Sequence, residues 1–159
     1  MKKQSNIFFF VFVVIILSTF FYLLIIERNP NTVPSALLNK EIPYFESTRL
    51  FKDKKFVSRN EFGNETVLVN FFATWCKPCR DEHKYIKLFS NRKIRVIGIN
   101  YKDDSKKTIQ WLNNLGNPYS DILIDKNGRI AIDWGAYGIP ETFVINSKGI
   151  IKYRHIGAI

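Results

Sequence analysis

The stretch ATWCKPCRDEH, residues 73–83, holds both cysteines of the chain, Cys76 and Cys79. Two cysteines at this spacing can form a structural disulfide, bind a metal ion, attach haem or exchange disulfides with another protein. A bridge that closes a loop of about four residues stabilises a fold by only about 2 kcal/mol in the chain-entropy model, which disfavours a purely structural role. Covalent haem attachment requires a histidine directly after the second cysteine, where this chain has Arg80.

Metal binding by the two cysteines would need further ligands, and the sequence offers few. A structural zinc site usually takes four cysteine or histidine ligands. The histidines are His83 and His155, and His83 follows Cys79 too closely for zinc-finger spacing. Two thiolates can hold Cu(I), although the single methionine, Met1, lies far from them in the sequence. We therefore expect no metal site, and Cu(I) delivery stays open as an alternative function.

Dithiol–disulfide exchange fits the local pattern best. The cysteines follow a continuous run rich in strand-forming residues, residues 66–73, which is typical of a strand buried on both faces. They precede apolar residues at helical spacing. Cys76 is then expected at a helix N-terminus, where unpaired N–H groups lower the pKa of a thiol. Pro78 suits the first helical turn, where no N–H partner is needed, and Trp75 is expected to form one wall of a contact groove. We expect Cys76 to attack a substrate disulfide and Cys79 to resolve the mixed disulfide.

The remaining pattern predicts an α/β fold with a mixed sheet flanked by helices. Asp104 or Ser105 is expected to cap a helix that ends near Gly116. Residues 125–128, DKNG, predict a turn with positive φ angles. The segments predicted after the cysteines are strands at 94–100 and 121–124, a helix at 103–117, and a terminal hairpin of 141–146 and 149–157.

The N-terminal residues are of another kind. The run from Ile7 to Ile26 is almost entirely apolar, and a helix of about 20 residues spans the roughly 30 Å core of a bilayer. No small-residue cleavage pattern follows it, which predicts an uncleaved anchor, and Lys2 and Lys3 before it predict a cytoplasmic N-terminus. The domain beyond the anchor is then expected in an oxidising compartment. The predicted parts are a cytoplasmic segment at 1–6, a transmembrane anchor at 7–26, a linker at 27–40 and a folded domain at 41–159.

The net charge of +10 comes from lysines and arginines scattered along the chain. A basic balance can favour nucleic acid, anionic lipid or an acidic partner. The sequence contains no long basic block and no recognised nucleic-acid-binding motif. We therefore expect a solvated basic surface and no nucleic-acid partner.

The pentapeptide WCKPC resembles the active-site motif of the thioredoxin superfamily. The stretch DKNGRIAIDWGAYGIPETFVINSKGIIKYRHIG narrows this likeness, because it resembles the membrane-anchored, thioredoxin-like proteins of cytochrome c maturation, the DsbE/CcmG family. The resemblance covers about residues 37–157 and implies a thioredoxin-like fold with Cys76 and Cys79 as the redox pair. It also implies a cis proline at Pro140 facing the dithiol, beside which Ile139 would pair with an extended substrate segment.

The same resemblance implies further residues near the dithiol. Glu82 and Glu141 match acidic residues of the family, with an ordinary surface charge as the alternative for each. Tyr137 matches an aromatic residue of the substrate groove, with core packing as its alternative. The sequence departs from the superfamily at Asn70, where many thioredoxins have a buried aspartate, so Glu82 is the better candidate for a proton acceptor. Family members also continue into a final helix, whereas this sequence stops at HIGAI, and we expect that helix to be missing here.

The family implies a thiol–disulfide oxidoreductase that acts as a periplasmic reductant in cytochrome c maturation. It would keep the cysteines of apocytochrome c, or of the chaperone that holds them, reduced for haem ligation, with no cofactor beyond the redox-active disulfide. A dithiol stays reduced in an oxidising space only if a partner supplies electrons, and we expect a membrane thiol–disulfide carrier in the bacterial inner membrane to do so. The alternatives are a general anchored oxidoreductase and a Cu(I) chaperone for oxidase assembly.

Overall fold

The computed structural model of the chain describes residues 2–25, 37–62 and 65–159. Its contacts divide the chain into two units, Met1–Thr32 and Val33–Ile159. In the first unit, α1 (Lys2–Ile25) is a single helix, and most of its apolar side chains between Ile7 and Leu23 are exposed.

Within the described residues, we find no helix that is both long and apolar enough to cross a membrane. The predicted transmembrane anchor therefore stays a prediction. The described residues do not include residue 1 or residues 26–36. The second range holds the last residue of the predicted anchor and most of the predicted linker.

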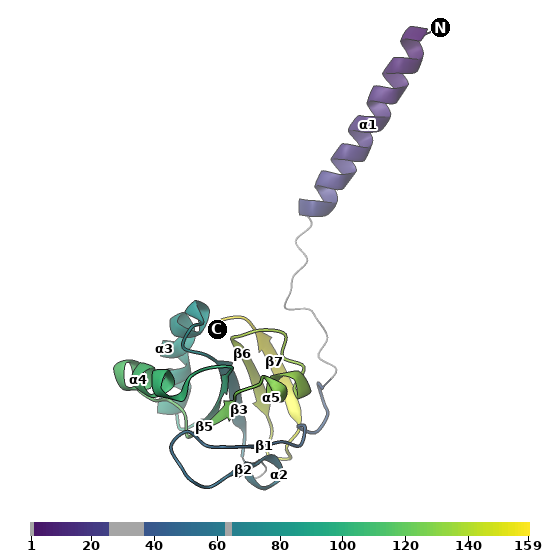
Figure 1. The fold of residues 1–159 in the computed structure, drawn as a ribbon. Helices are drawn as coiled ribbons and strands as arrows, with labels where there is room; N and C mark the ends of the chain where they lie inside the picture. The colour runs from purple at the N-terminus through teal and green to yellow at the C-terminus, as the bar shows by residue number, and fades with distance from the viewer. Residues whose placement is uncertain (1, 26–36, 63–64) are drawn as a thin grey trace. The chain divides into compact units, whose positions relative to one another are not determined.

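The second unit is built on a five-stranded mixed sheet with the strand order β5-β4-β3-β6-β7, which confirms the predicted α/β architecture (Figure 1). Strands β3, β4 and β5 run parallel, whereas β6 is antiparallel to β3 and β7 is antiparallel to β6. The strands of the sheet are β3 (Val67–Phe72), β4 (Arg95–Tyr101), β5 (Asp121–Asp125), β6 (Glu141–Ile145) and β7 (Ile151–Ile156). The helices of this unit are α2 (Ser58–Glu61), α3 (Lys77–Asn91), α4 (Ser105–Leu115) and α5 (Arg129–Asp133).

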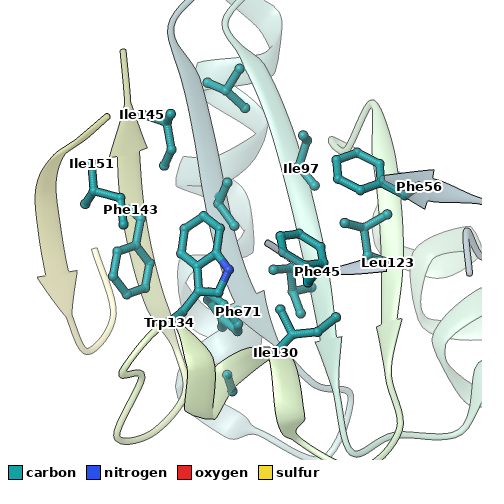
Figure 2. Close-up of a cluster of buried hydrophobic side chains, with 14 residues drawn as sticks. Phe45, Phe56, Phe71, Ile97, Leu123, Ile130, Trp134, Phe143, Ile145 and Ile151 are labelled. Carbon is teal, nitrogen blue, oxygen red and sulfur yellow. The ribbon is translucent and has the colours of Figure 1, made fainter. Parts of the chain in front are cut away.

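Strand β3 lies in the middle of the sheet and is buried along its whole length. Side chains of a strand alternate between its two faces. Val67, Val69 and Phe71 belong to a core that includes Trp134 at the end of α5. Figure 2 shows Phe71 and Trp134 within this core. Leu68 and Phe72 belong to a second core, which contains side chains of α3 and α4. The sheet is therefore covered on both faces, which explains why its central strand is apolar except for Asn70.

The two long helices of this unit begin at the residues that the sequence predicted. Cys76 is the N-cap of α3, and Pro78 lies in its first turn. Asp104 is the N-cap of α4, because its carboxylate accepts the N–H of Lys107 at 2.9 Å, and Gly116 ends the helix with a positive φ of 87°. These ends fix the positions of α3 and α4 relative to the strands before them.

Two parts of the sequence prediction differ from the structure at their edges. The linker was predicted to reach residue 40, but Leu37 packs against the core and Asn39 donates its N–H to Ile151 at 2.8 Å. The DKNG turn leads into the unpredicted helix α5, and Gly128 alone in that turn has a positive φ, 74°. The sequence also did not predict α2 or the small two-stranded sheet of β1 (Glu46–Ser47) and β2 (Phe56–Val57).

Candidate active site

The two cysteines lie where β3 passes into α3, and a disulfide joins them. Cys76 is the N-cap residue, and its Sγ accepts the backbone N–H of Cys79 at 3.1 Å. Cys76 is 5% exposed and Cys79 is 2% exposed, so Cys76 is the outer sulfur of the pair. An N–H bond to the sulfur and the positive end of α3 both favour a thiolate at Cys76 once the bridge is reduced.

The residues just before Cys76 are held by the loop after β4. Asp103 accepts the backbone N–H of Thr74 at 2.6 Å and the Thr74 hydroxyl at 2.9 Å. The indole N–H of Trp75 donates to the carbonyl of Lys102 at 3.3 Å, while the side chain remains 59% exposed. Trp75 is thus a fixed aromatic surface beside the outer cysteine rather than a core residue.

The loop that precedes β6, residues 137–140, reaches the same edge of the sheet as the two cysteines; it is called the proline loop. Glu141 at the beginning of β6 pairs with Phe71 near the end of β3, so the residues before Glu141 lie beside the residues that follow β3. The peptide bond between Ile139 and Pro140 is cis. Ile139 packs against the core cluster that contains both cysteines. The fold therefore brings the proline loop and the dithiol together from positions more than 60 residues apart in the sequence.

Glu141 holds this proline loop from within the protein. Its side chain is completely buried, and Oε1 accepts the backbone N–H groups of Tyr137 at 2.7 Å and of Gly138 at 3.1 Å. Its Oε2 forms an ion pair with Arg154 of β7, with both nitrogen–oxygen distances at 2.8 Å. The Arg154 guanidinium lies 4.6 Å from the ring centre of Tyr137, whose side chain is 69% exposed. Glu141 is therefore an internal support of the loop, and Tyr137 is a surface aromatic residue.

A second buried carboxylate lies one helical turn after the inner cysteine. Cys79 and Glu82 share the buried face of α3, and Glu82 is 1% exposed. The Asn70 amide donates to Glu82 Oε1 at 2.8 Å and to the Thr142 hydroxyl at 3.0 Å. Burial raises the pKa of Glu82, and this effect outweighs the hydrogen bonds that would lower it. A carboxyl group with a raised pKa next to a thiol is suited to exchange a proton with it.

Asn70 connects this carboxyl group to the second core. Its side-chain oxygen accepts the Tyr119 hydroxyl at 2.9 Å, and burial raises the pKa of Tyr119 well above its usual value. Tyr119 stacks on Phe72, with 4.7 Å between ring centres. Gly98 lies under both rings, and a Cβ there would approach Phe72 to 2.8 Å. The residue that replaces the aspartate of many thioredoxins is thus a buried connector rather than an ionisable group.

His83 is the other buried polar residue of α3. Its Nε2 lies 2.8 Å from the carbonyl oxygen of Gly116, and its ring meets that of Trp111 edge to face at 4.4 Å. Burial lowers the pKa of His83, and the nearby charges of Lys87 and Arg80 lower it further. His83 therefore joins α3 to the end of α4 as a neutral side chain.

The structure thus places the residues that the sequence singled out for the site around one edge of the sheet. Both glutamates are buried, which excludes an ordinary surface charge for each, and the exposure of Tyr137 excludes core packing. The supporting residues that the sequence did not indicate are Asp103, Tyr119, His83 and Arg154. Each acts through a contact between segments far apart in the chain, and no local motif marks any of them.

Comparison with known proteins gives consistent results for this chain. Residues 37–159 match the family model described as Redoxin. The thiol:disulfide interchange protein DsbE of Escherichia coli K12 is 45% identical over 130 residues, which are 81% of this chain and 70% of that protein. The protein of the same name from Vibrio cholerae serotype O1 is 42% identical over 131 residues, 82% of this chain and 71% of that protein.

Solved structures with lower sequence identity show the same fold. A secreted thiol-disulfide isomerase from Corynebacterium glutamicum superposes with a TM-score of 0.69 at 17% identity, covering 84% of this chain and 88% of that one. A thiol-disulfide oxidoreductase from Bacteroides fragilis gives a TM-score of 0.62 at 24% identity, covering 74% of this chain and 90% of that one. The second unit therefore has the thioredoxin-like fold that the WCKPC resemblance implied.

Proposed function

Since the chain belongs to the redoxin family, and within it to the DsbE thiol:disulfide interchange proteins, we propose that it reduces protein disulfides during cytochrome c maturation. Its substrates would be apocytochrome c, or the chaperone that holds it, with their cysteines kept reduced for haem ligation. The observation that carries the proposal is the dithiol at the start of α3, with the buried Glu82 one turn behind its inner cysteine. The comparisons favour neither of the two alternative functions.

The reaction transfers two electrons from the dithiol to a substrate disulfide. The Cys76 thiolate attacks one substrate sulfur, which forms a mixed disulfide and releases the other sulfur as a thiolate that takes up a proton. Cys79 then loses its proton, and its thiolate attacks Cys76 Sγ, which releases the second substrate thiol. The substrate gains two electrons and two protons, and the protein is left with the Cys76–Cys79 disulfide. Glu82 is the group that would take the proton of Cys79.

The surface around Cys76 suits an extended polypeptide. Among the described residues, no hydrogen-bond partner is found for the backbone of Ile139, whereas the carbonyl of Pro140 accepts the N–H of Gly157 at 3.0 Å. An extended substrate segment would pair with the Ile139 backbone, as a strand pairs with a sheet edge. Trp75 and Tyr137 are the exposed aromatic side chains that would contact such a segment.

The proposed location is the periplasmic side of the bacterial inner membrane, with the apolar run of residues 7–26 as a single-pass anchor. The apolar run in the sequence supports it, and so do the hydroxyls of Ser18 and Thr19, which donate to the carbonyl of Ile15 in the same helix at 2.9 and 2.8 Å. Hydroxyls bonded in this way are not left unpaired in an apolar surrounding. The electrons would come from a membrane thiol–disulfide carrier, because an oxidising compartment does not regenerate a dithiol.

The Cys79→Ala variant tests the proposal, because the mixed disulfide cannot be resolved without Cys79. We expect a partner linked through Cys76, recovered from cells under non-reducing conditions and released by a reductant. Cys76→Ala/Cys79→Ala is the matched control and should capture nothing. Identification of the partner as apocytochrome c or a maturation protein supports the assignment. A set of unrelated thiol proteins would instead indicate the general anchored oxidoreductase.

A further inference from the structure

A polar recess lies between α3 and α4, on the face of the sheet that these two helices cover. It is a cavity of about 250 Å³. Its lining comes from the segment before the cysteines, from α3 and from one face of α4. The lining residues are Thr74, Arg80, Lys107, Gln110, Trp111 and Asn114.

The recess is lined by hydrogen-bond donors and contains no carboxylate. Its two charged residues, Arg80 and Lys107, are both cations. The Arg80 guanidinium lies 6.0 Å from the ring centre of Trp111, so the two side chains form one wall. Trp111 is 5% exposed, and its indole Nε1 has no hydrogen-bond partner among the described residues. Two cations that line one recess without a carboxylate favour an anionic acceptor.

Two aspartates just before α4 make hydrogen bonds outside the recess. Asp103 accepts hydrogen bonds from Thr74, and the carboxylate of Asp104 accepts the backbone N–H of Lys107. Neither aspartate lines the recess. Its positive charge is therefore not neutralised by the residues that form it.

Residues that line the recess are close to Cys76 in the sequence. Thr74 comes two residues before Cys76, and Arg80 follows it by one helical turn, with its backbone N–H donating to the Cys76 carbonyl at 3.3 Å. A polypeptide bound through a disulfide to Cys76 would carry its neighbouring side chains past this position. The proline loop precedes β6, whereas most of the residues that line the recess belong to α4.

We propose that this recess binds the carboxylate of an acidic residue close to the reacting cysteine of the partner polypeptide. The inference rests on the proposed function, because the acidic side chain is brought there by the mixed disulfide with Cys76. Arg80 and Lys107 would bind its charge. The recess would thus select among disulfide substrates by the sequence that flanks their cysteines.

The test uses disulfide-bonded peptides in matched pairs, with aspartate or the isosteric asparagine at each position flanking the cysteines in turn. The full reduced chain in detergent is mixed with each peptide at low ionic strength, and reduced peptide is measured after acid quenching. An exposed or half-exposed ion pair contributes up to about 1 kcal/mol, so we expect at least one aspartate peptide to react about three- to fivefold faster than its asparagine partner. Added salt should reduce this preference.

Two variants separate the recess from the general positive charge of the protein. Lys107→Gln should bring the aspartate-to-asparagine rate ratio close to one. Lys106→Gln removes the same charge from the adjacent exposed residue, which does not line the recess, and should keep the ratio. Equal rates for both peptides at every position, or a loss of preference as large in Lys106→Gln, would overturn the inference. Failure to reduce any of the peptides would contradict the proposed function instead.

Discussion

The ion pair between Glu141 and Arg154 allows a quantitative prediction, because both side chains are buried. Glu141 is 0% exposed and Arg154 is 3% exposed at the side chain. In Glu141→Gln the amide oxygen can still accept the N–H groups of Tyr137 and Gly138, but the amide nitrogen then faces the guanidinium. The charge of Arg154 remains buried without its partner.

Removal of one partner from a buried ion pair costs about 3–5 kcal/mol. Because the backbone hydrogen bonds are retained, we expect Glu141→Gln to lower the unfolding free energy by about 3 kcal/mol, at the lower end of this range. A change of this size is a large part of the roughly 5–15 kcal/mol that stabilises a typical domain. We also expect the loop before Pro140 to loosen, since its two N–H groups depend on the orientation of residue 141.

The assay is urea unfolding of the oxidised full chain in detergent, followed by fluorescence of the tryptophans, with Trp134 in the core next to β6. The matched control is Glu65→Gln, which removes a carboxylate that is 52% exposed and lies 3.5 Å from Arg95. It should change the unfolding free energy by less than about 0.5 kcal/mol. The double variant Glu141→Gln/Arg154→Met should recover part of the loss, because it removes the unpaired charge. A loss below about 1 kcal/mol for Glu141→Gln, at an unchanged denaturant slope, would refute the reasoning.

Three further predictions concern the two buried titratable residues of α3, Glu82 and His83. Glu82→Gln should slow the attack of Cys79 on the mixed disulfide by about tenfold or more and leave the first attack, by Cys76, unchanged. Rapid acid quenching can follow the two steps separately. An unchanged rate of the attack by Cys79 would exclude Glu82 as the proton acceptor. Because the pKa of Glu82 is raised, the folded chain keeps the Glu82 proton to a higher pH than the unfolded chain does. The unfolding free energy therefore falls as pH rises above about 4.5, and Glu82→Gln should remove this dependence. The lowered pKa of His83 has the opposite sign: the unfolded chain takes up a proton first as pH falls below about 6.5, so the unfolding free energy decreases there. His83→Phe should flatten that part of the pH curve and His155→Asn should not; equal curves for wild type and His83→Phe would show that His83 does not cause it.

Much of the fold is visible in the sequence because it depends on local patterns. A strand buried on both faces is mostly apolar, so the run before the cysteines indicated β3 although it contains Asn70. Capping residues and glycines mark helix ends, which placed Cys76 and Asp104 at the starts of α3 and α4. Short elements such as α5 and β1 were not predicted, because a few residues carry no clear periodicity.

The sequence by itself determined the reacting groups, since two cysteines separated by two residues at a strand–helix junction have few other uses. Only the tertiary structure decided how the carboxylates behave. Glu82 is buried because α3 packs on the face of β3 where Asn70 lies, and Glu141 is buried because β7 brings Arg154 beside it. A pKa or an ion pair depends on what surrounds a group in space, and here Asn70 is 12 positions from Glu82 and Arg154 is 13 positions from Glu141. Residue type and spacing specify the chemistry, whereas burial and long-range partners specify the charge state in which it works.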